Sequence, residues 1–238
     1  MNDRKRAVRY GISFVILAVL LIFLFIWNVN SGSIHLSVQE ILNIIFRHQG
    51  DETSYNIVWE IRLPRILAVI ILGGALSVSG FLLQTFFANP IAGPFVLGIS
   101  SGAKMVVALT MIYYLGRAVN VTSYTLIIAA FIGSLISIGF ILLISKRIKH
   151  MATLLVAGIM IGYICSAVTD FVVTFADDSD IVNLHGWSQG SFSGMSWSNV
   201  YISCVVVGIT LILTFLLSKP IGAYQLGEAY AQRMGVNI

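Results

Sequence analysis

The chain has 238 residues, of which 58% are hydrophobic and only 10% are charged, and its mean hydropathy is +0.92. Soluble domains carry about 25% charged residues, so this composition excludes an ordinary soluble domain. The net charge of +4 is small and scattered along the chain, and we expect no nucleic-acid partner.

A helix that crosses a membrane needs about 20 apolar residues. By that measure, the sequence predicts an all-α polytopic transmembrane bundle, a single domain over residues 1–238 surrounded by membrane lipid. The third span is the weakest prediction, because glycine and serine fill its first turns. The six predicted spans are residues 10–28, 64–88, 96–115, 124–145, 152–175 and 197–218.

Basic residues gather before the first span, after the fourth and after the sixth. Six spans bring all three clusters to one side of the membrane, and the positive-inside rule makes that side cytoplasmic. Both termini are therefore predicted to be cytoplasmic. The clusters are Arg4, Lys5, Arg6 and Arg9, then Lys146, Arg147 and Lys149, then Lys219 and Arg233.

Two short helices are expected on the outer side. Ser37 and Glu40 have the spacing of a capping box, which predicts a helix over residues 37–47. Between the fifth and sixth spans, Asp180 is expected to cap a second helix that ends at Gly190. Gly194 is expected to end this helix together with Gly190, and Trp187 and Trp197 suit the headgroup level there.

The second span is expected to begin at the Arg62–Pro64–Arg65 segment, because proline is tolerated in the first helical turn. Arginines at a helix N-terminus oppose the macrodipole. Two interpretations stay open from the chemistry: the guanidinium groups reach the lipid headgroups, or they bind carboxylates of an external partner. Further along this span, small residues predict a packing surface. They are Gly73, Gly74, Ser77, Ser79 and Gly80.

A polar hairpin from Gln84 to Gly98 follows, and it must lie at a membrane face or against other protein. The run GISSGAK at 98–104 does not match a phosphate-binding loop, since its glycines are too close together and Met105 replaces the required hydroxyl. Any ATP would therefore have to be hydrolysed by another subunit.

Asp170 lies inside the fifth span, where a lipid-facing carboxylate is unfavourable by a few kcal/mol. A residue of an aqueous pathway and a structural hydrogen bond to a neighbouring span are both compatible with this position. Cys165 and Cys204 are expected to be free thiols. Neither a metal-ligand spacing nor a catalytic arrangement occurs, so we expect no metal, no cofactor and no enzyme.

After the sixth span, Pro220 is expected to end the helix, and residues 224–236 are predicted to form a short amphipathic cytoplasmic helix. Leu226, Tyr230 and Met234 recur at helical spacing, and Gly235 closes the segment. A helix on a lipid surface would carry several basic residues. This one carries a single arginine, which favours docking on a cytosolic partner.

Taken together, these segments resemble the permease subunits of the ABC importers for iron-siderophores, haem and cobalamin. The resemblance covers about residue 55 to the last residue. The matching segments are RLPR at 62–65, SGFLLQ at 79–84, NPIAGPFVLGISSGA at 89–103, LLVAGIMIGYICSA at 154–167, GSFSGMSW at 190–197 and LGEAYAQRMGV at 226–236.

The resemblance implies that Arg62 and Arg65 pair with glutamates of an extracytoplasmic substrate-binding protein. It implies a pathway-facing Asp170, a second, identical or paralogous, permease subunit, and a location in the bacterial cell membrane. It also implies that the segment near the carboxyl end is a coupling helix seated on a separate ATPase subunit. The residues carried over to that helix are Leu226, Gly227, Glu228, Ala231, Met234 and Gly235.

Permeases of this kind usually have ten spans, whereas this sequence carries the equivalent of the first six, without the C-terminal third. A truncated product, one piece of a split protein and a fragment are the three explanations. Two rival functions stay open: a non-transporting remnant or scaffold, and an ion-coupled secondary transporter. The latter would normally show more intramembrane charge than Asp170.

Overall fold

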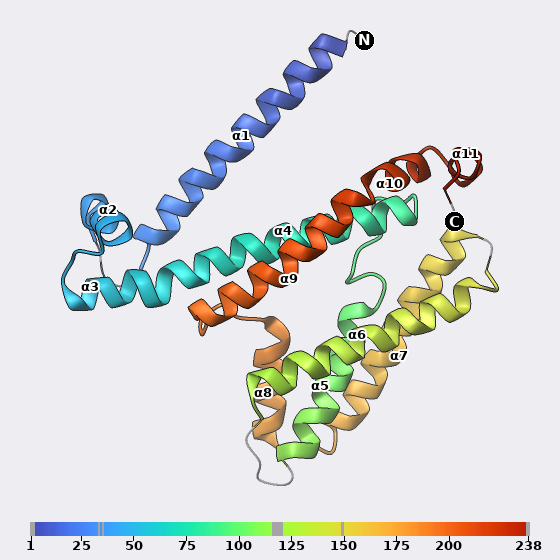
Figure 1. Ribbon diagram of the computed structural model, residues 1–238. Helices are drawn as coiled ribbons and strands as arrows, with labels where there is room; N and C mark the ends of the chain where they lie inside the picture. Colours follow the sequence, from blue (N-terminus) through green and yellow to red (C-terminus); the bar gives the residue numbers. More distant parts are fainter. Residues whose placement is uncertain (1–2, 33, 35, 116–120, 149, 237–238) are drawn as a thin grey trace. The chain divides into compact units, whose positions relative to one another are not determined.

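The computed structural model describes residues 3–32, 34, 36–115, 121–148 and 150–236, and these are helices joined by turns and loops (Figure 1). Among these described residues, five helices are long and apolar enough to cross a membrane, which confirms the all-α polytopic fold. The third predicted span is a shorter helix, α5. The elements are α1 (Asp3–Asn30), α2 (Val38–Arg47), α3 (Glu52–Asn56), η1 (Ile57–Arg62), α4 (Leu63–Phe86), α5 (Ile99–Leu115), α6 (Ser123–Ser145), α7 (Met151–Val173), α8 (Asp178–Gln189), α9 (Trp197–Leu216), α10 (Ser218–Gln225) and α11 (Glu228–Arg233).

The chain forms two compact units. The first comprises Met1–Gly73 and Phe192–Ile209, and the second comprises Gly74–Ser191 and Thr210–Ile238. Each is described by itself.

In the first unit, α2 begins with the predicted capping box. The Ser37 hydroxyl accepts a hydrogen bond from the backbone N–H of Glu40 at 3.2 Å, and the Glu40 carboxylate accepts one from the Ser37 N–H at 2.8 Å. The backbone N–H and then the hydroxyl of Ser37 hold the pKa of Glu40 below its usual 4.5. Ile41 and Ile44 of α2 are buried in a cluster with Val29, so the prediction of this helix is confirmed.

The predicted start of the second span was wrong. Helix runs without a break from Glu52 to Phe86, so Pro64 lies well inside it. The π-helical turn η1 explains how the chain accommodates the proline. There the N–H of Leu63 bonds to the carbonyl of Val58, five residues back instead of four. The register of the backbone hydrogen bonds thus changes just before Pro64, which has no N–H to donate. The arginines are therefore not at a helix N-terminus.

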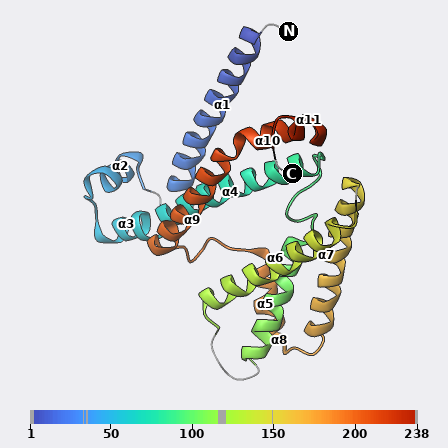
Figure 2. The same ribbon diagram turned by 45° about the vertical axis from the view of Figure 1, so that its right-hand side comes forward.

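In the second unit, α5 packs against α6 and α7 through glycines (Figures 1 and 2). A Cβ on Gly102 would collide with the Ser137 hydroxyl and would lie 2.7 Å from the carbonyl oxygen of Gly133, both on α6. A Cβ on Gly98, which has φ +71°, would lie 2.6 Å from the backbone nitrogen of Gly162 on α7. The glycine-rich run at 98–104 thus brings helix backbones close together.

The hairpin before α5 lies against protein, one of the two places predicted for it. Phe87, Ala92 and Leu97 are buried in a cluster with residues of α6 and α7. The Asn89 side-chain oxygen accepts a hydrogen bond from the N–H of Ile91 at 2.9 Å and stabilises the turn. Cys165 of α7 belongs to the same cluster.

The second outer helix was predicted with the wrong cap. α8 begins at Asp178 after Asp177, and Asp180 is a buried residue of its first turn. The burial of Leu184 against α5 explains why the helix extends over this segment. Gly190, with φ +77°, follows the last helical residue as predicted.

Both cysteines are free, with Cys165 buried and Cys204 exposed, as predicted. The small-residue packing surface predicted on α4 is not used for close packing within the described chain. Among the described residues, nothing lies within 4 Å of a Cβ placed on Gly73, Gly74 or Gly80. These glycines therefore do not mediate close helix packing within the described chain.

Candidate functional site

Arg62 forms hydrogen bonds with the carboxyl end of α1 and with Ile34, which follows that helix. Its Nη1 donates to the carbonyl of Val29 at 2.6 Å, and its Nη2 donates to the carbonyl of Ile34 at 2.9 Å. The carbonyls of the last helical turn have no partner within their own helix, so a guanidinium group there is favourable. We call this set of contacts the arginine clamp. A Cβ on Gly32 would collide with the guanidinium group, so the clamp as it stands leaves no room for a side chain there.

Arg65 is exposed, unlike the half-buried Arg62. Its Nε donates to the carbonyl of Phe192 at 3.3 Å. The structure thus places the two predicted docking arginines in the same unit but in different environments. Of these two arginines, Arg65 is the exposed one.

The π-helical turn also binds the start of α9. Because the N–H of Leu63 bonds to Val58 and Pro64 has no N–H, neither residue donates to the carbonyl of Trp59. The indole N–H of Trp197 donates to that oxygen at 2.9 Å, and the two tryptophan rings lie 5.2 Å apart. Sequence reasoning missed this contact, since its partners are far apart in the chain.

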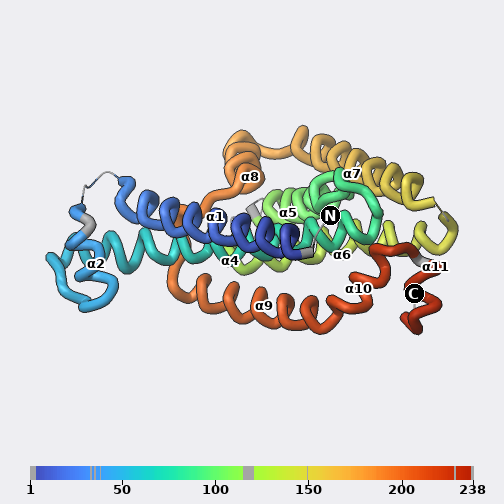
Figure 3. Tube along the Cα trace, turned by 90° about the horizontal axis from the view of Figure 1, so that it is seen from above, coloured from blue at the N-terminus to red at the C-terminus, as the bar shows by residue number. Residues whose placement is uncertain are grey.

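The segment after α9 forms two short helices instead of one helix over residues 224–236. α9 ends before Pro220, and α10 and α11 follow its carboxyl end (Figure 3). Gly227, with φ +111°, separates α10 from α11, and Gly235, with φ +83°, follows α11. A positive φ is strained for residues with a side chain, so both glycines set the course of the chain.

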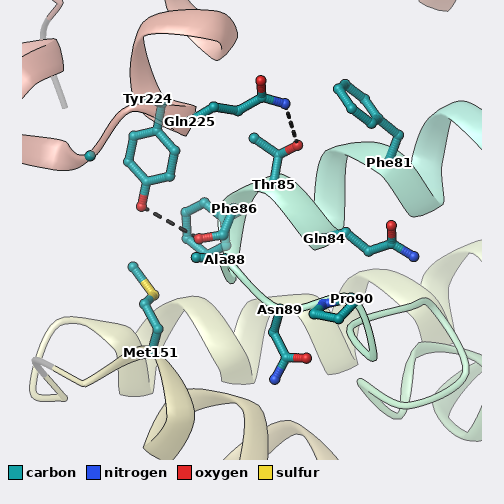
Figure 4. A pocket seen from close by; sticks show the side chains of 11 residues that line it. Phe81, Gln84, Thr85, Phe86, Ala88, Asn89, Pro90, Met151, Tyr224 and Gln225 are labelled. Atoms are coloured by element: carbon teal, nitrogen blue, oxygen red, sulfur yellow. Dashed lines mark hydrogen bonds between the residues drawn. The ribbon is translucent and has the colours of Figure 1, made fainter. Parts of the chain in front are cut away.

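The carboxyl end of α10 is attached to the end of α4 (Figure 4). The Tyr224 hydroxyl donates to the carbonyl of Phe86 at 3.5 Å, and the rings of these two residues stack with centroids 6.1 Å apart. The Gln225 side-chain N–H donates to the Thr85 hydroxyl at 3.2 Å. A cavity of about 520 Å³ lies beside these contacts and extends to Met151 of α7.

Beyond this attachment, apolar side chains of the segment are exposed. Leu226 is 68% exposed and Met234 is 64% exposed, whereas Ala231 is fully buried. The side chain of Glu228 lies outside the described part of the chain. The segment therefore combines an anchored end with an uncovered apolar surface.

Asp170 is exposed on α7, close to the end of that helix at Val173. Its backbone carbonyl accepts a hydrogen bond from the Thr174 hydroxyl. Within the described part of the chain, its carboxylate has no partner, so the predicted alternative of a hydrogen bond to a neighbouring span is not seen there. Lys104, a partly buried cation in the second turn of α5, was missed, although a lysine inside an apolar stretch is visible in the sequence.

The described residues contain no group of three or more His, Cys, Asp or Glu side chains that could hold a metal ion.

Comparison with known proteins identifies relatives. The profile of the FecCD transport family matches residues 20–238. The hemin transport system permease protein HmuU of Yersinia pestis is 34% identical over 224 residues, which are 93% of this chain and 66% of HmuU. The vitamin B12 import system permease protein BtuC of Klebsiella pneumoniae is 39% identical over 181 residues, 75% of this chain and 53% of BtuC.

A solved structure shares the fold. It is described as an inward-facing conformation of a metal-chelate type ABC transporter, and it superposes with a TM-score of 0.77 at 23% identity. The match covers 93% of this chain and 67% of the other. The chain thus spans between about half and two-thirds of the length of the proteins it matches.

Proposed function

Because this chain belongs to the FecCD transport family, we propose that it is the membrane permease subunit of a binding-protein-dependent, ATP-driven importer of metal chelates. The cargo is an iron-siderophore, haem or cobalamin. The observation that carries the proposal is the segment of α10 and α11, anchored to the end of α4 and apolar on its exposed surface. We call residues 224–236 the coupling segment.

A separate ATP-binding cassette subunit supplies the energy. The exposed side chains of Leu226 and Met234 fit an apolar groove on such a partner, whereas Gly227 and Gly235 set the course of the backbone. Movement of the ATPase would reach α4 through Tyr224 and Gln225, which bond to the end of that helix. The chain itself contributes the transport pathway and no catalytic group.

A change at Gly227 tests this coupling role. Gly227→Val places a branched side chain at φ +111° and should reorient α11, so the assembled importer should lose most of its cargo-stimulated ATPase activity. Gly222→Val is the matched control, since a Cβ there also meets open space but the backbone φ is not positive. Normal stimulation in the Gly227→Val complex, with intact assembly, would contradict the proposal.

An extracytoplasmic binding protein docks at the start of α4. Arg65 is exposed and offers its guanidinium group for a bidentate bond with a carboxylate. Arg62 supports the same surface through the arginine clamp. Arg65→Glu should weaken capture of the cognate binding protein roughly tenfold or more, the scale of losing a charged hydrogen bond. A pull-down with unchanged affinity would argue against Arg65 as a docking residue.

The remaining parts of the proposal concern the assembly. The chain is one transmembrane domain in the bacterial plasma membrane, with its amino terminus and coupling segment cytoplasmic. It pairs with a second permease subunit, and the cargo passes between the two. Asp170 lies on an exposed face of α7, as a residue of that pathway would.

A further inference from the structure

Two charged residues lie in helices that are otherwise without charge. In α5, α6, α7 and α9, the sequence places Lys104 and Asp170 and no other acidic or basic residue. A charge that faces lipid costs a few kcal/mol on insertion scales, so such residues are directed to protein or to water. We therefore expect α5 and α7 to direct Lys104 and Asp170 toward protein or water and away from lipid.

The contacts between α5 and α7 bring these charges to the same level. Gly98 lies against Gly162, and further along both helices the Ser166 hydroxyl lies 3.5 Å from the Ser101 hydroxyl. Residue numbers therefore rise in the same direction along the two helices. Lys104 follows Ser101 by three residues and Asp170 follows Ser166 by four, which is one turn in each case.

Both charges also lie on the same side of the helix pair. On α5, Gly102 faces α6, and at 100° per residue Lys104 is turned about 200° away from it. On α7, Cys165 faces Ser137 of α6 at 3.9 Å, and Asp170 is turned about 140° away. The side of α5 and α7 opposite α6 therefore carries four polar residues, which we call the polar strip. They are Ser101, Lys104, Ser166 and Asp170.

The polar strip is open to a ligand. Asp170 is exposed, and Ser101, Lys104 and Ser166 are each partly accessible. In the part of the chain that the structure describes, neither charged side chain has a salt-bridge or hydrogen-bond partner. Three of the four side chains can donate hydrogen bonds, and only the carboxylate is restricted to accepting them.

We propose that the polar strip is a cargo-binding site that selects chelates with anionic oxygen groups, such as carboxylates. This inference rests on the proposed transport function and narrows its substrate class. The Lys104 ammonium group binds the anionic oxygen, and its flexible stem carries three donors that can turn toward the ligand. The serine hydroxyls add donors, and Asp170 balances the lysine charge when no cargo is bound.

A pair of porphyrins that differ in charge tests the proposal. The full chain in phosphatidylcholine nanodiscs is titrated with iron(III) protoporphyrin IX, which has two carboxylates, and with its dimethyl ester, in which both are neutral. The Soret band reports binding, and empty nanodiscs give the background. We expect wild type to bind the diacid roughly tenfold or more tightly than the ester, the scale of one charged hydrogen bond.

Variants assign that preference to Lys104. Lys104→Gln should lose the preference, and Lys104→Arg should keep it, which separates the loss of charge from a failure to fold. Lys146→Gln is the matched control, because it removes a cation at the end of α6, outside the polar strip. Asp170→Asn should keep or increase the preference for the diacid.

Three results would overturn the proposal: no porphyrin binding by wild type, equal affinity for the two porphyrins, or a preference that survives in Lys104→Gln. The ATPase measurement with Gly227→Val is independent of cargo charge. Loss of stimulation there without a porphyrin preference would leave the transport function standing and refute the site. A porphyrin preference combined with normal stimulation in Gly227→Val would refute the coupling role and retain the site.

Discussion

At the scale of single residues, Arg62 shows how one side chain can serve structure where the sequence pattern points to an external partner. Its guanidinium group bonds two backbone carbonyls, which would otherwise need water. The neighbouring Arg65 remains exposed. Of the two arginines that flank Pro64, Arg62 therefore supports the backbone and Arg65 remains accessible.

The arginine clamp depends on Gly32. We expect Gly32→Ala to lower the unfolding midpoint in detergent, because the added methyl group collides with the Arg62 guanidinium group. The flexible Arg62 side chain can move aside, so the cost is that of its bonds to the two carbonyls, about 1–2 kcal/mol. Gly11→Ala in α1 is the control, since a Cβ there meets nothing within 4 Å, and its midpoint should not fall. Equal midpoints for both variants would show that the clamp does not stabilise the unit.

At the scale of elements, the packing of α5 shows how a short helix is held between two longer ones. It begins beside the middle of α7, where Gly98 meets Gly158 and Gly162, and it crosses α6 at Gly102. Small residues at both crossings let the backbones approach closely, which favours association where the surroundings are already apolar.

The α5–α6 crossing can be tested directly. Gly102→Ala should destabilise the protein by about 1–3 kcal/mol, because the new Cβ meets Ser137 and Gly133. Adding Ser137→Ala should restore part of the loss by removing the hydroxyl, while the Gly133 carbonyl remains in the way. Gly139→Ala on α6 is the control, since its Cβ position is open. Stability is read from the thermal unfolding midpoint; a Gly102→Ala variant as stable as the control would contradict this packing.

These elements also show how far a sequence predicts structure. The capping box of Ser37 and Glu40 was correctly predicted, because the evidence for it is local, and the hairpin before α5 occupies one of the two places predicted for it. The π-helical turn was not predicted, since a proline normally indicates a helix start. The acceptors of Arg62 and the partners of Gly102 come from distant parts of the chain, and no spacing within one segment reveals them.

At the scale of the whole molecule, the proposed function requires the docking surface and the coupling segment to lie on opposite sides of the membrane. By the positive-inside rule, the basic clusters predict that both termini are cytoplasmic. With six predicted spans, the start of α4 is then expected to face outward and the coupling segment to face inward.

Cysteine labelling measures this orientation. In a Cys204→Ser background, a membrane-impermeant maleimide should label Glu60→Cys on intact spheroplasts. It should label Met234→Cys only after permeabilisation, and both positions are exposed in the structure. Cys165 is buried, so its labelling gives the background signal. Labelling of both positions from the same side would exclude the proposed transport mechanism.

The contact between Gly102 and Gly133 has a consequence for how this protein can change over evolutionary time. Because each glycine meets the other's backbone, neither can gain a methyl group unless the facing helix moves, and a smaller residue at 137 removes only part of the collision at Gly102. Mutations at these three positions are therefore expected to be accepted only in particular combinations, so their order of appearance matters. Adaptation to a new cargo should proceed through residues such as Lys104 on the opposite side of α5, where a change leaves this crossing intact.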